Sequence, residues 1–137
     1  MSLSDGVKFV QISDSHLFDT SDKRLIGVNT DESLRAIISL VAMETNVTGI
    51  LATGDISQDA SLASYQRFEK IVSKLDLPVY WLPGNHDNPD YFHNSAENFP
   101  LPNRSLIETE FWRILMLDSV IPGDDSGHLA SSELNYI

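Results

Sequence analysis

The stretch VTGILATGD, residues 47–55, decides how this sequence folds. Its apolar part, residues 47–53, is too short and too rich in β-branched side chains for a helix, so it predicts a buried strand. Gly54 and Asp55 end the run, which places the Asp55 carboxylate directly after the strand. A Gly-Asp pair is by itself ordinary turn chemistry, so its meaning depends on the segments around it.

Two further segments repeat this pattern of a strand followed by polar residues. Residues 7–12 (VKFVQI) form a β-branched run that leads into Asp14 and His16. Residues 79–82 (VYWL) form another, followed by Pro-Gly-Asn-His-Asp at positions 83–87. Both runs predict strands that end in turn-forming residues.

The segments between the strands predict two helices. Asn29 can cap the first, with Glu32 three residues later, and Ser61 can cap the second, which ends before Pro78. Apolar side chains recur at helical spacing and are expected to face the core: Leu34, Ile37, Ile38, Val41 and Ala42 in the first helix, and Leu62, Tyr65, Phe68, Val72 and Leu75 in the second.

The order strand, helix, strand, helix, strand predicts the α/β class, with right-handed crossovers and a mostly parallel sheet. Residues 105–109 and 111–117 predict an antiparallel pair near the C-terminus, and a further helix begins at Ser131. The sequence shows no internal linker, so residues 1–137 are expected to form a single domain.

Two further predictions concern the burial of aromatic residues and the position of a turn. Tyr80, Trp81 and Trp112 are expected in the core of their strands, because large aromatic side chains favour burial. Asp124 and Asp125 are expected to form a solvated turn.

Charge and composition narrow the possible functions. Nine Lys and Arg against twenty Asp and Glu give a net charge of −11, which disfavours duplex nucleic acid as a partner. The sequence has no Cys, so any metal has to be held by oxygen and imidazole ligands. No run approaches the roughly 18 apolar residues of a membrane helix, so we expect a cytoplasmic protein with no membrane partner.

The three polar clusters are expected to converge, because ligands of open α/β sheets gather at the carboxyl ends of the strands. The clusters are Asp14 with His16, Gly54 with Asp55, and residues 84–87. They offer carboxylates, imidazoles and an amide oxygen, which are the ligand types that a pair of divalent cations needs. We therefore predict a two-metal site, whose ligands permit Mn, Fe, Zn, Co or Mg.

The segments ISDSHLF (residues 12–18), ATGDISQDAS (52–61) and LPGNHD (82–87) resemble the D-x-H, G-D and G-N-H-[DE] blocks of the calcineurin-like metallophosphoesterases. The order and spacing of the blocks match that family. The resemblance implies the N-terminal part of the family's four-layer α/β/β/α sandwich. Segments 25–37 and 57–68 further resemble bacterial class III 3′,5′-cyclic AMP phosphodiesterases and glycerophosphodiesterases.

The resemblance also implies ligands for two divalent metal ions. Asp14 and His16 would hold the first metal, Asp55 would bridge both, and Asn85 would hold the second. The family's later His block and Gly-His-x-His block have no counterpart, so the second site is expected to be weak.

The implied reaction is hydrolysis of a small phosphodiester, such as a 3′,5′-cyclic nucleotide. Hydroxide would come from water acidified by the two metals. His86 would face the phosphate and donate to it, and Asp87 would orient the His86 ring through a hydrogen bond.

Other interpretations stay open. The sheet face that the rest of the family fold would cover is expected to drive self-association. A second hypothesis is a truncated, catalytically silent module that keeps the fold and a partial metal site. A third is a flavodoxin-like nucleotide-binding domain, which the sequence disfavours because it has no Gly-rich phosphate loop.

Overall fold

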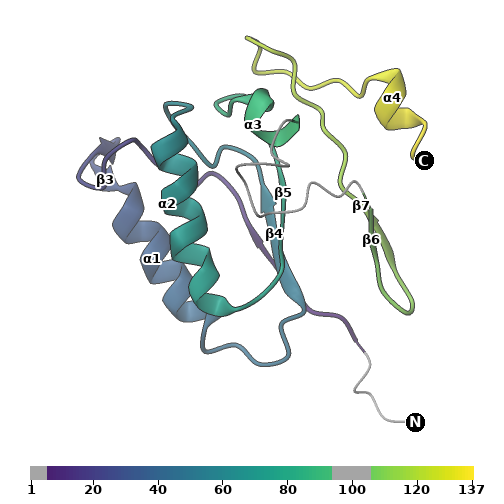
Figure 1. Cartoon of the computed structure of the whole chain (residues 1–137), viewed down its shortest axis with the longest axis horizontal. Coiled ribbons are helices and arrows are strands. Elements are labelled where there is room, and N and C mark those ends of the chain that lie inside the picture. Colours follow the sequence, from purple (N-terminus) through teal and green to yellow (C-terminus); the bar gives the residue numbers. More distant parts are fainter. Residues whose placement is uncertain (1–5, 94–105) are drawn as a thin grey trace.

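The computed structural model of the protein describes residues 6–93 and 106–137 (Figure 1). Strands β1, β4 and β5 form a parallel sheet with β4 in the middle, and two antiparallel pairs, β2–β3 and β6–β7, lie outside it. The strands are β1 (Phe9–Ile12), β2 (Arg24–Leu25), β3 (Val28–Asn29), β4 (Gly49–Thr53), β5 (Val79–Leu82), β6 (Leu106–Glu108) and β7 (Arg113–Leu115). The helices are α1 (Thr30–Val41), α2 (Leu62–Val72), the 3₁₀ helix η1 (Ser73–Leu75), α3 (Pro89–His93) and α4 (Ser131–Leu134).

The register of the central sheet brings the strand ends to one level. Ile12 pairs with Ala52, and Thr53 pairs with Leu82. The loops that follow β1, β4 and β5 therefore leave the sheet at the same edge. This arrangement confirms the predicted α/β class and the mostly parallel sheet with an antiparallel pair near the C-terminus.

Both long helices begin at the predicted caps. The Asn29 side chain accepts a hydrogen bond from the Glu32 amide at 3.0 Å, and Ser61 Oγ accepts one from the Ser64 amide at 3.3 Å. Such caps satisfy amides that the helix itself leaves unpaired. The second helix ends at Val72, and η1 carries the chain toward Pro78.

The core lies between the sheet and the two long helices, which Figure 1 shows together on one side of the strands. Burying one such large apolar side chain contributes about 1.5–3 kcal/mol. The buried apolar side chains of the two helices are Leu34, Ile38 and Val41 in α1 and Tyr65, Phe68, Ile71 and Val72 in α2. Ile37 and Leu62 were predicted on the buried faces and are instead 43% and 38% exposed, because each lies at the edge of its apolar stripe.

The C-terminal antiparallel pair exists but is shorter than predicted. The predicted first strand began at Ser105, which lies outside the described residues. Trp112 was predicted in a strand core and is 63% exposed instead, because it lies in the turn before β7. Trp81 is buried as predicted, and Tyr80 is only partly buried.

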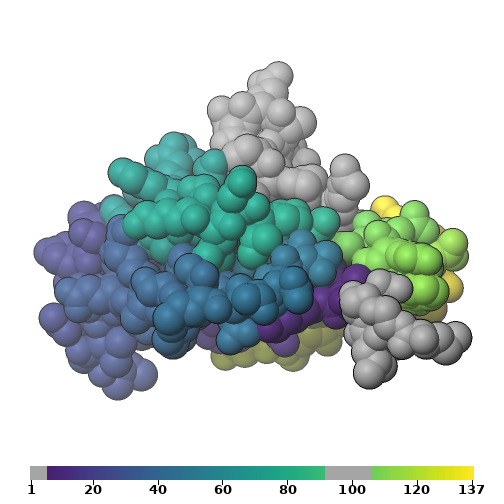
Figure 2. All heavy atoms as spheres, turned by 90° about the horizontal axis from the view of Figure 1, so that it is seen from below, coloured from purple at the N-terminus to yellow at the C-terminus, as the bar shows by residue number. Residues whose placement is uncertain are grey.

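Figure 2 shows the segment of β2 and β3 at one end of the molecule and the β6–β7 pair (green) at the other. The two small antiparallel pairs thus lie on opposite sides of the central strands, as Figure 1 also shows. No helix among the described residues is long and apolar enough to cross a membrane.

Candidate metal centre

The loops after β1 and β4 are joined by their backbones at the carboxyl edge of the sheet. The amide of Asp14 donates to the carbonyl of Gly54 at 3.1 Å, and the amide of His16 donates to the carbonyl of Asp55 at 2.9 Å. These two bonds continue the parallel pairing of β1 and β4 past the strand ends. The side chains of the first two polar clusters are thereby fixed relative to each other.

Three of the candidate ligands have left-handed backbone conformations. The φ angles are +56° for Asp14, +43° for His16 and +50° for Asp55. Residues other than Gly rarely adopt this region, and each such residue costs on the order of 1–3 kcal/mol. Backbone strain of this kind concentrates at functional sites, where the surrounding structure has to hold side chains in fixed directions.

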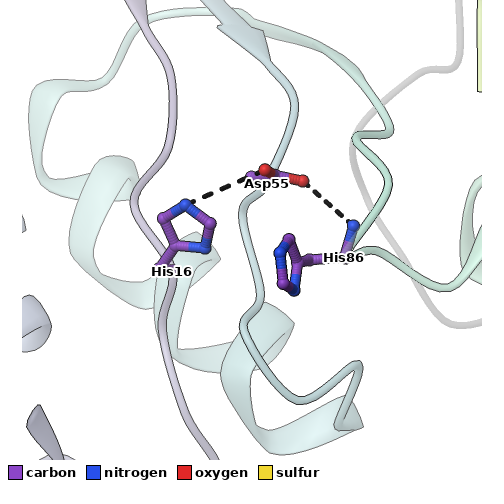
Figure 3. Close-up of side chains that lie close together, drawn as sticks. All are labelled: His16, Asp55 and His86. Atoms are coloured by element: carbon purple, nitrogen blue, oxygen red, sulfur yellow. Dashed lines mark hydrogen bonds and ion pairs between the residues drawn. The ribbon is translucent and has the colours of Figure 1, made fainter. Parts of the chain in front are cut away.

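Figure 3 shows three side chains that lie close together, His16, Asp55 and His86. One ligand atom from each lies within 4.8 Å of the others. The imidazole rings of His16 and His86 are 5.2 Å apart and meet edge to face at 83°. The amide of His86 donates to Asp55 Oδ1 at 3.1 Å, which ties the loop after β5 to the Asp55 carboxylate.

Gly84 allows the loop after β5 to approach Asp55 closely. A Cβ atom on this residue would lie 2.1 Å from Asp55 Oδ1 and 2.4 Å from the Asp55 amide nitrogen. Both separations are far below van der Waals contact. In the structure, Asp55 occupies the space that a side chain at position 84 would need.

Asn85 lies on a second side of the cluster, in a cavity of about 300 Å³ that Asp14 and Asp55 also line. Its side-chain nitrogen donates to Asp125 Oδ1 at 3.0 Å. Because that nitrogen is engaged, the amide oxygen of Asn85 is the atom left to act as a ligand. Asp125 is exposed, as predicted for a turn, but it also contacts the site, which the sequence did not indicate.

Asp87 points into the protein rather than toward His86. Its Oδ2 accepts hydrogen bonds from the Gly84 and Ile56 amides, and its Oδ1 accepts them from the Ser57 amide and the Tyr65 hydroxyl. The distances range from 2.8 Å to Gly84 to 3.2 Å to Ile56. This carboxylate therefore joins the loops after β4 and β5 from beneath the site.

The predicted hydrogen bond between Asp87 and the His86 ring is not found among the described residues. The His86 Nδ1 atom instead lies 3.2 Å from the side-chain nitrogen of Gln58. Burial raises the pKa of Asp87, although its hydrogen bonds from Gly84, Ser57, Ile56 and Tyr65 oppose that effect. Burial, followed by the nearby Asp87 charge, raises the pKa of the Tyr65 hydroxyl, which therefore stays protonated as a donor.

The carboxylates of the site have no Lys or Arg partner among the described residues. His16 Nε2 lies 3.6 Å from Asp14 Oδ1 and 3.8 Å from Asp55 Oδ2, and no ion pair among the described residues joins Lys or Arg to either Asp. These separations exceed hydrogen-bond length. A cation with bonds of roughly 2.0–2.2 Å to nitrogen and oxygen can span them. The donor set thus fits divalent cations held by imidazole and oxygen ligands.

His16 supports the same interpretation from the opposite side of its ring. Its Nδ1 atom is buried and has no hydrogen-bond partner among the described residues. The ring is thus oriented by packing, with Nε2 facing Asp14 and Asp55. In the part of the chain that the structure describes, the His16 imidazole makes no hydrogen bond that metal binding would have to break.

The structure brings five of the six predicted site residues to one edge of the sheet and turns the sixth, Asp87, inward. It also adds Gln58 and Asp125, which sequence reasoning missed. Gln58 follows the Gly-Asp cluster closely and was available as a polar neighbour. Asp125 is far from every cluster in the sequence, and no local pattern connects it to Asn85.

Comparison with known proteins agrees with this geometry. Residues 7–132 match the Calcineurin-like phosphoesterase family. The chain is 40% identical over 133 residues to a 3′,5′-cyclic adenosine monophosphate phosphodiesterase CpdA of Pseudomonas aeruginosa, and 35% identical over 133 residues to the protein of that name in Escherichia coli K12. Each match covers 96% of this chain and 48% of the relative, so the chain spans about half the length of these curated relatives.

Proposed function

Because this chain belongs to the calcineurin-like phosphoesterase family, we propose that its site binds divalent cations and serves the hydrolysis of a small phosphodiester. The observation that carries the proposal is the convergence of His16, Asp55 and His86, whose ligand atoms lie within 4.8 Å of one another. The names of the relatives favour 3′,5′-cyclic nucleotides as the substrate class.

The proposed ligands divide between two cations. Asp14 and His16 would hold one, Asn85 would hold the other through its amide oxygen, and Asp55 would serve both. Divalent cations at such a site acidify coordinated water and neutralise charge on the phosphoryl oxygens. The protein contributes a set of ligands that is oriented in advance by strained backbone and by the hydrogen bonds of Asp87.

His86 has the geometry of a donor to the substrate. The side-chain nitrogen of Gln58 can only donate, so His86 Nδ1 is the acceptor in this contact and Nε2 is the ring nitrogen left to donate. The imidazole is exposed, whereas its own backbone amide is held by Asp55. Nε2 can thus offer a hydrogen bond or a proton to a phosphoryl or leaving-group oxygen.

The direct test measures hydrolysis of bis(4-nitrophenyl) phosphate with and without added Mn²⁺. We expect metal-dependent turnover that falls at least about 100-fold in Asp55→Asn, because this residue is the proposed ligand of both cations. Asp90→Asn, an exposed change in α3, is the matched control and should retain the rate. Equal rates with and without metal would contradict the proposal.

A metal-binding module without turnover is the second candidate. It is favoured by the small number of ligands that the described residues offer to the Asn85 side of the site. Under both candidates, calorimetric titration with Mn²⁺ should show binding that Asp55→Asn weakens. The hydrolysis assay separates them, because only the first candidate predicts turnover.

A further inference from the structure

A second cavity, of about 340 Å³, opens beside the metal site, and its wall is mostly apolar. Asp14 and His16 form part of its wall, so it is continuous with the candidate centre. The rest of the wall comes from the β2–β3 hairpin and from one face of α1. Cavities of this size with a few polar groups at one end are typical of small-molecule sites.

The lining of the cavity indicates what it can accept. Its apolar wall is formed by Leu25, Ile26 and Val28 of the hairpin segment and by Leu34 and Ile37 of α1. The described residues that line it include hydroxyl groups but no Lys or Arg. A second phosphate or another anion would have no counter-charge there, whereas an uncharged organic group would bury apolar surface.

The turn of the β2–β3 hairpin holds an apolar residue in an unfavourable backbone conformation. Leu25 pairs with Val28, so Ile26 and Gly27 form a two-residue turn, and their φ angles are +47° and +83°. Turns with two positive φ angles favour Asn-Gly, and a β-branched residue in this region is a marked outlier. Ile26 is also 96% exposed, so its side chain gains nothing from packing within the described chain.

We propose that this cavity binds the uncharged heterocyclic or aryl group of the phosphodiester whose phosphate lies at the metal centre, with Ile26 as part of the apolar wall. The inference rests on the proposed function for the position of the phosphate. Three observations carry it independently: the continuity of the cavity with Asp14 and His16, the absence of Lys and Arg from its described lining, and the unfavourable, exposed Ile26. A base or aryl ring in the cavity gives Ile26 the packing partner that the described residues do not supply.

The test uses adenosine, which has the heterocycle and lacks the phosphate, and follows the methyl signals of Leu25, Val28 and Ile37 by NMR in the full chain. Adenosine should shift these signals without added metal, whereas ribose should not. Ser33→Trp, which fills the cavity from α1, should weaken adenosine binding at least tenfold. Ser39→Trp makes the same change on an exposed part of α1 outside the cavity and should bind normally.

Ile26→Asn adds a second, independent readout. Because Asn tolerates the left-handed region, this variant should unfold at the same or a higher temperature and yet bind adenosine more weakly. Loss of binding in a stable variant distinguishes a ligand wall from a structural role. Unshifted pocket methyls in the wild-type protein, or equal adenosine binding in Ser33→Trp and Ser39→Trp, would overturn the proposal.

Inorganic phosphate, titrated by calorimetry in the presence of Mn²⁺, separates the two proposals. If phosphate binds and adenosine does not, the cavity proposal fails and the metal site stands. If adenosine binds in the cavity and phosphate does not bind with Mn²⁺, the proposed function fails and the cavity remains a site for an uncharged ring.

Discussion

Replacing Gly84 with Ala should disable the metal site while leaving the chain folded. The added Cβ would lie 2.1 Å from Asp55 Oδ1, 2.4 Å from the Asp55 amide nitrogen and 2.8 Å from Asp55 Cγ. Rotation of the Asp55 side chain relieves the contacts with the carboxylate but not the contact with the amide nitrogen. The two loops therefore have to separate by roughly 1 Å. In a site whose groups are held in position, a displacement of this size can lower the reaction rate about 100-fold.

Calorimetric titration with Mn²⁺ measures the consequence. We expect Gly84→Ala to bind Mn²⁺ at least tenfold more weakly, because the movement also breaks the 3.1 Å hydrogen bond from the His86 amide to Asp55. Overpacking of this kind typically costs about 1–3 kcal/mol, which is less than the usual 5–15 kcal/mol of a folded domain. Circular dichroism should accordingly show a folded protein with a lower unfolding midpoint.

Gly6→Ala is the matched control, because a Cβ at Gly6 has no heavy atom within 4 Å. It should keep both the Mn²⁺ affinity and the unfolding midpoint of the wild type. If Gly84→Ala binds Mn²⁺ as tightly as Gly6→Ala does, the close approach of the loop to Asp55 does not determine the geometry of the site.

Three further changes test other parts of the structure. Asp87→Ala leaves three buried donors and the half-buried Gly84 amide without their acceptor, so urea denaturation should show a loss of about 3–4 kcal/mol, against less than about 1 kcal/mol for the neighbouring, exposed His86→Ala. Burial raises the pKa of Asp59, but hydrogen bonds from Ser61, Asp19 and Ser57 outweigh it and leave the pKa lowered. The stability that this carboxylate contributes is therefore present above its unfolded pKa of 3.8 and is lost as pH falls through the folded value, so wild type and Asp59→Asn should converge in acid unfolding profiles. Asp125→Ala should weaken Mn²⁺ binding by about tenfold, because the Asn85 amide loses the partner that orients it, whereas Asp124→Ala should not; equal affinities would exclude this role for Asp125.

The sequence was sufficient to predict the framework of the site. The three strands, both long helices and their caps at Asn29 and Ser61 follow from short-range patterns, because capping and side-chain periodicity involve residues a few positions apart. The edge at which the polar clusters meet follows from the parallel order of the strands. The predicted burial of Trp112 was wrong, because the ends of short strands depend on pairing partners rather than on residue type.

The direction of individual side chains depended on contacts between distant segments. Asp87 was predicted to support the His86 ring, yet four donors, three of them from residues 22 to 31 positions away, draw its carboxylate inward. Asp125 reaches Asn85 across 40 positions, and Gln58 reaches His86 across 28. These pairings cannot be predicted from local sequence patterns, because each depends on which loops lie next to each other in the folded chain.

The order of residues along the chain is enough to predict which side chains can serve as ligands and at which edge of the sheet they lie. The folded chain adds that His16, Asp55 and His86 lie close together, that Gly84 has to be small because Asp55 fills its surroundings, and that an apolar cavity adjoins the centre. This division arises because residue chemistry and strand order are local or periodic properties of the chain. Distances between side chains are set by the packing and hydrogen bonding of loops that the sequence places far apart.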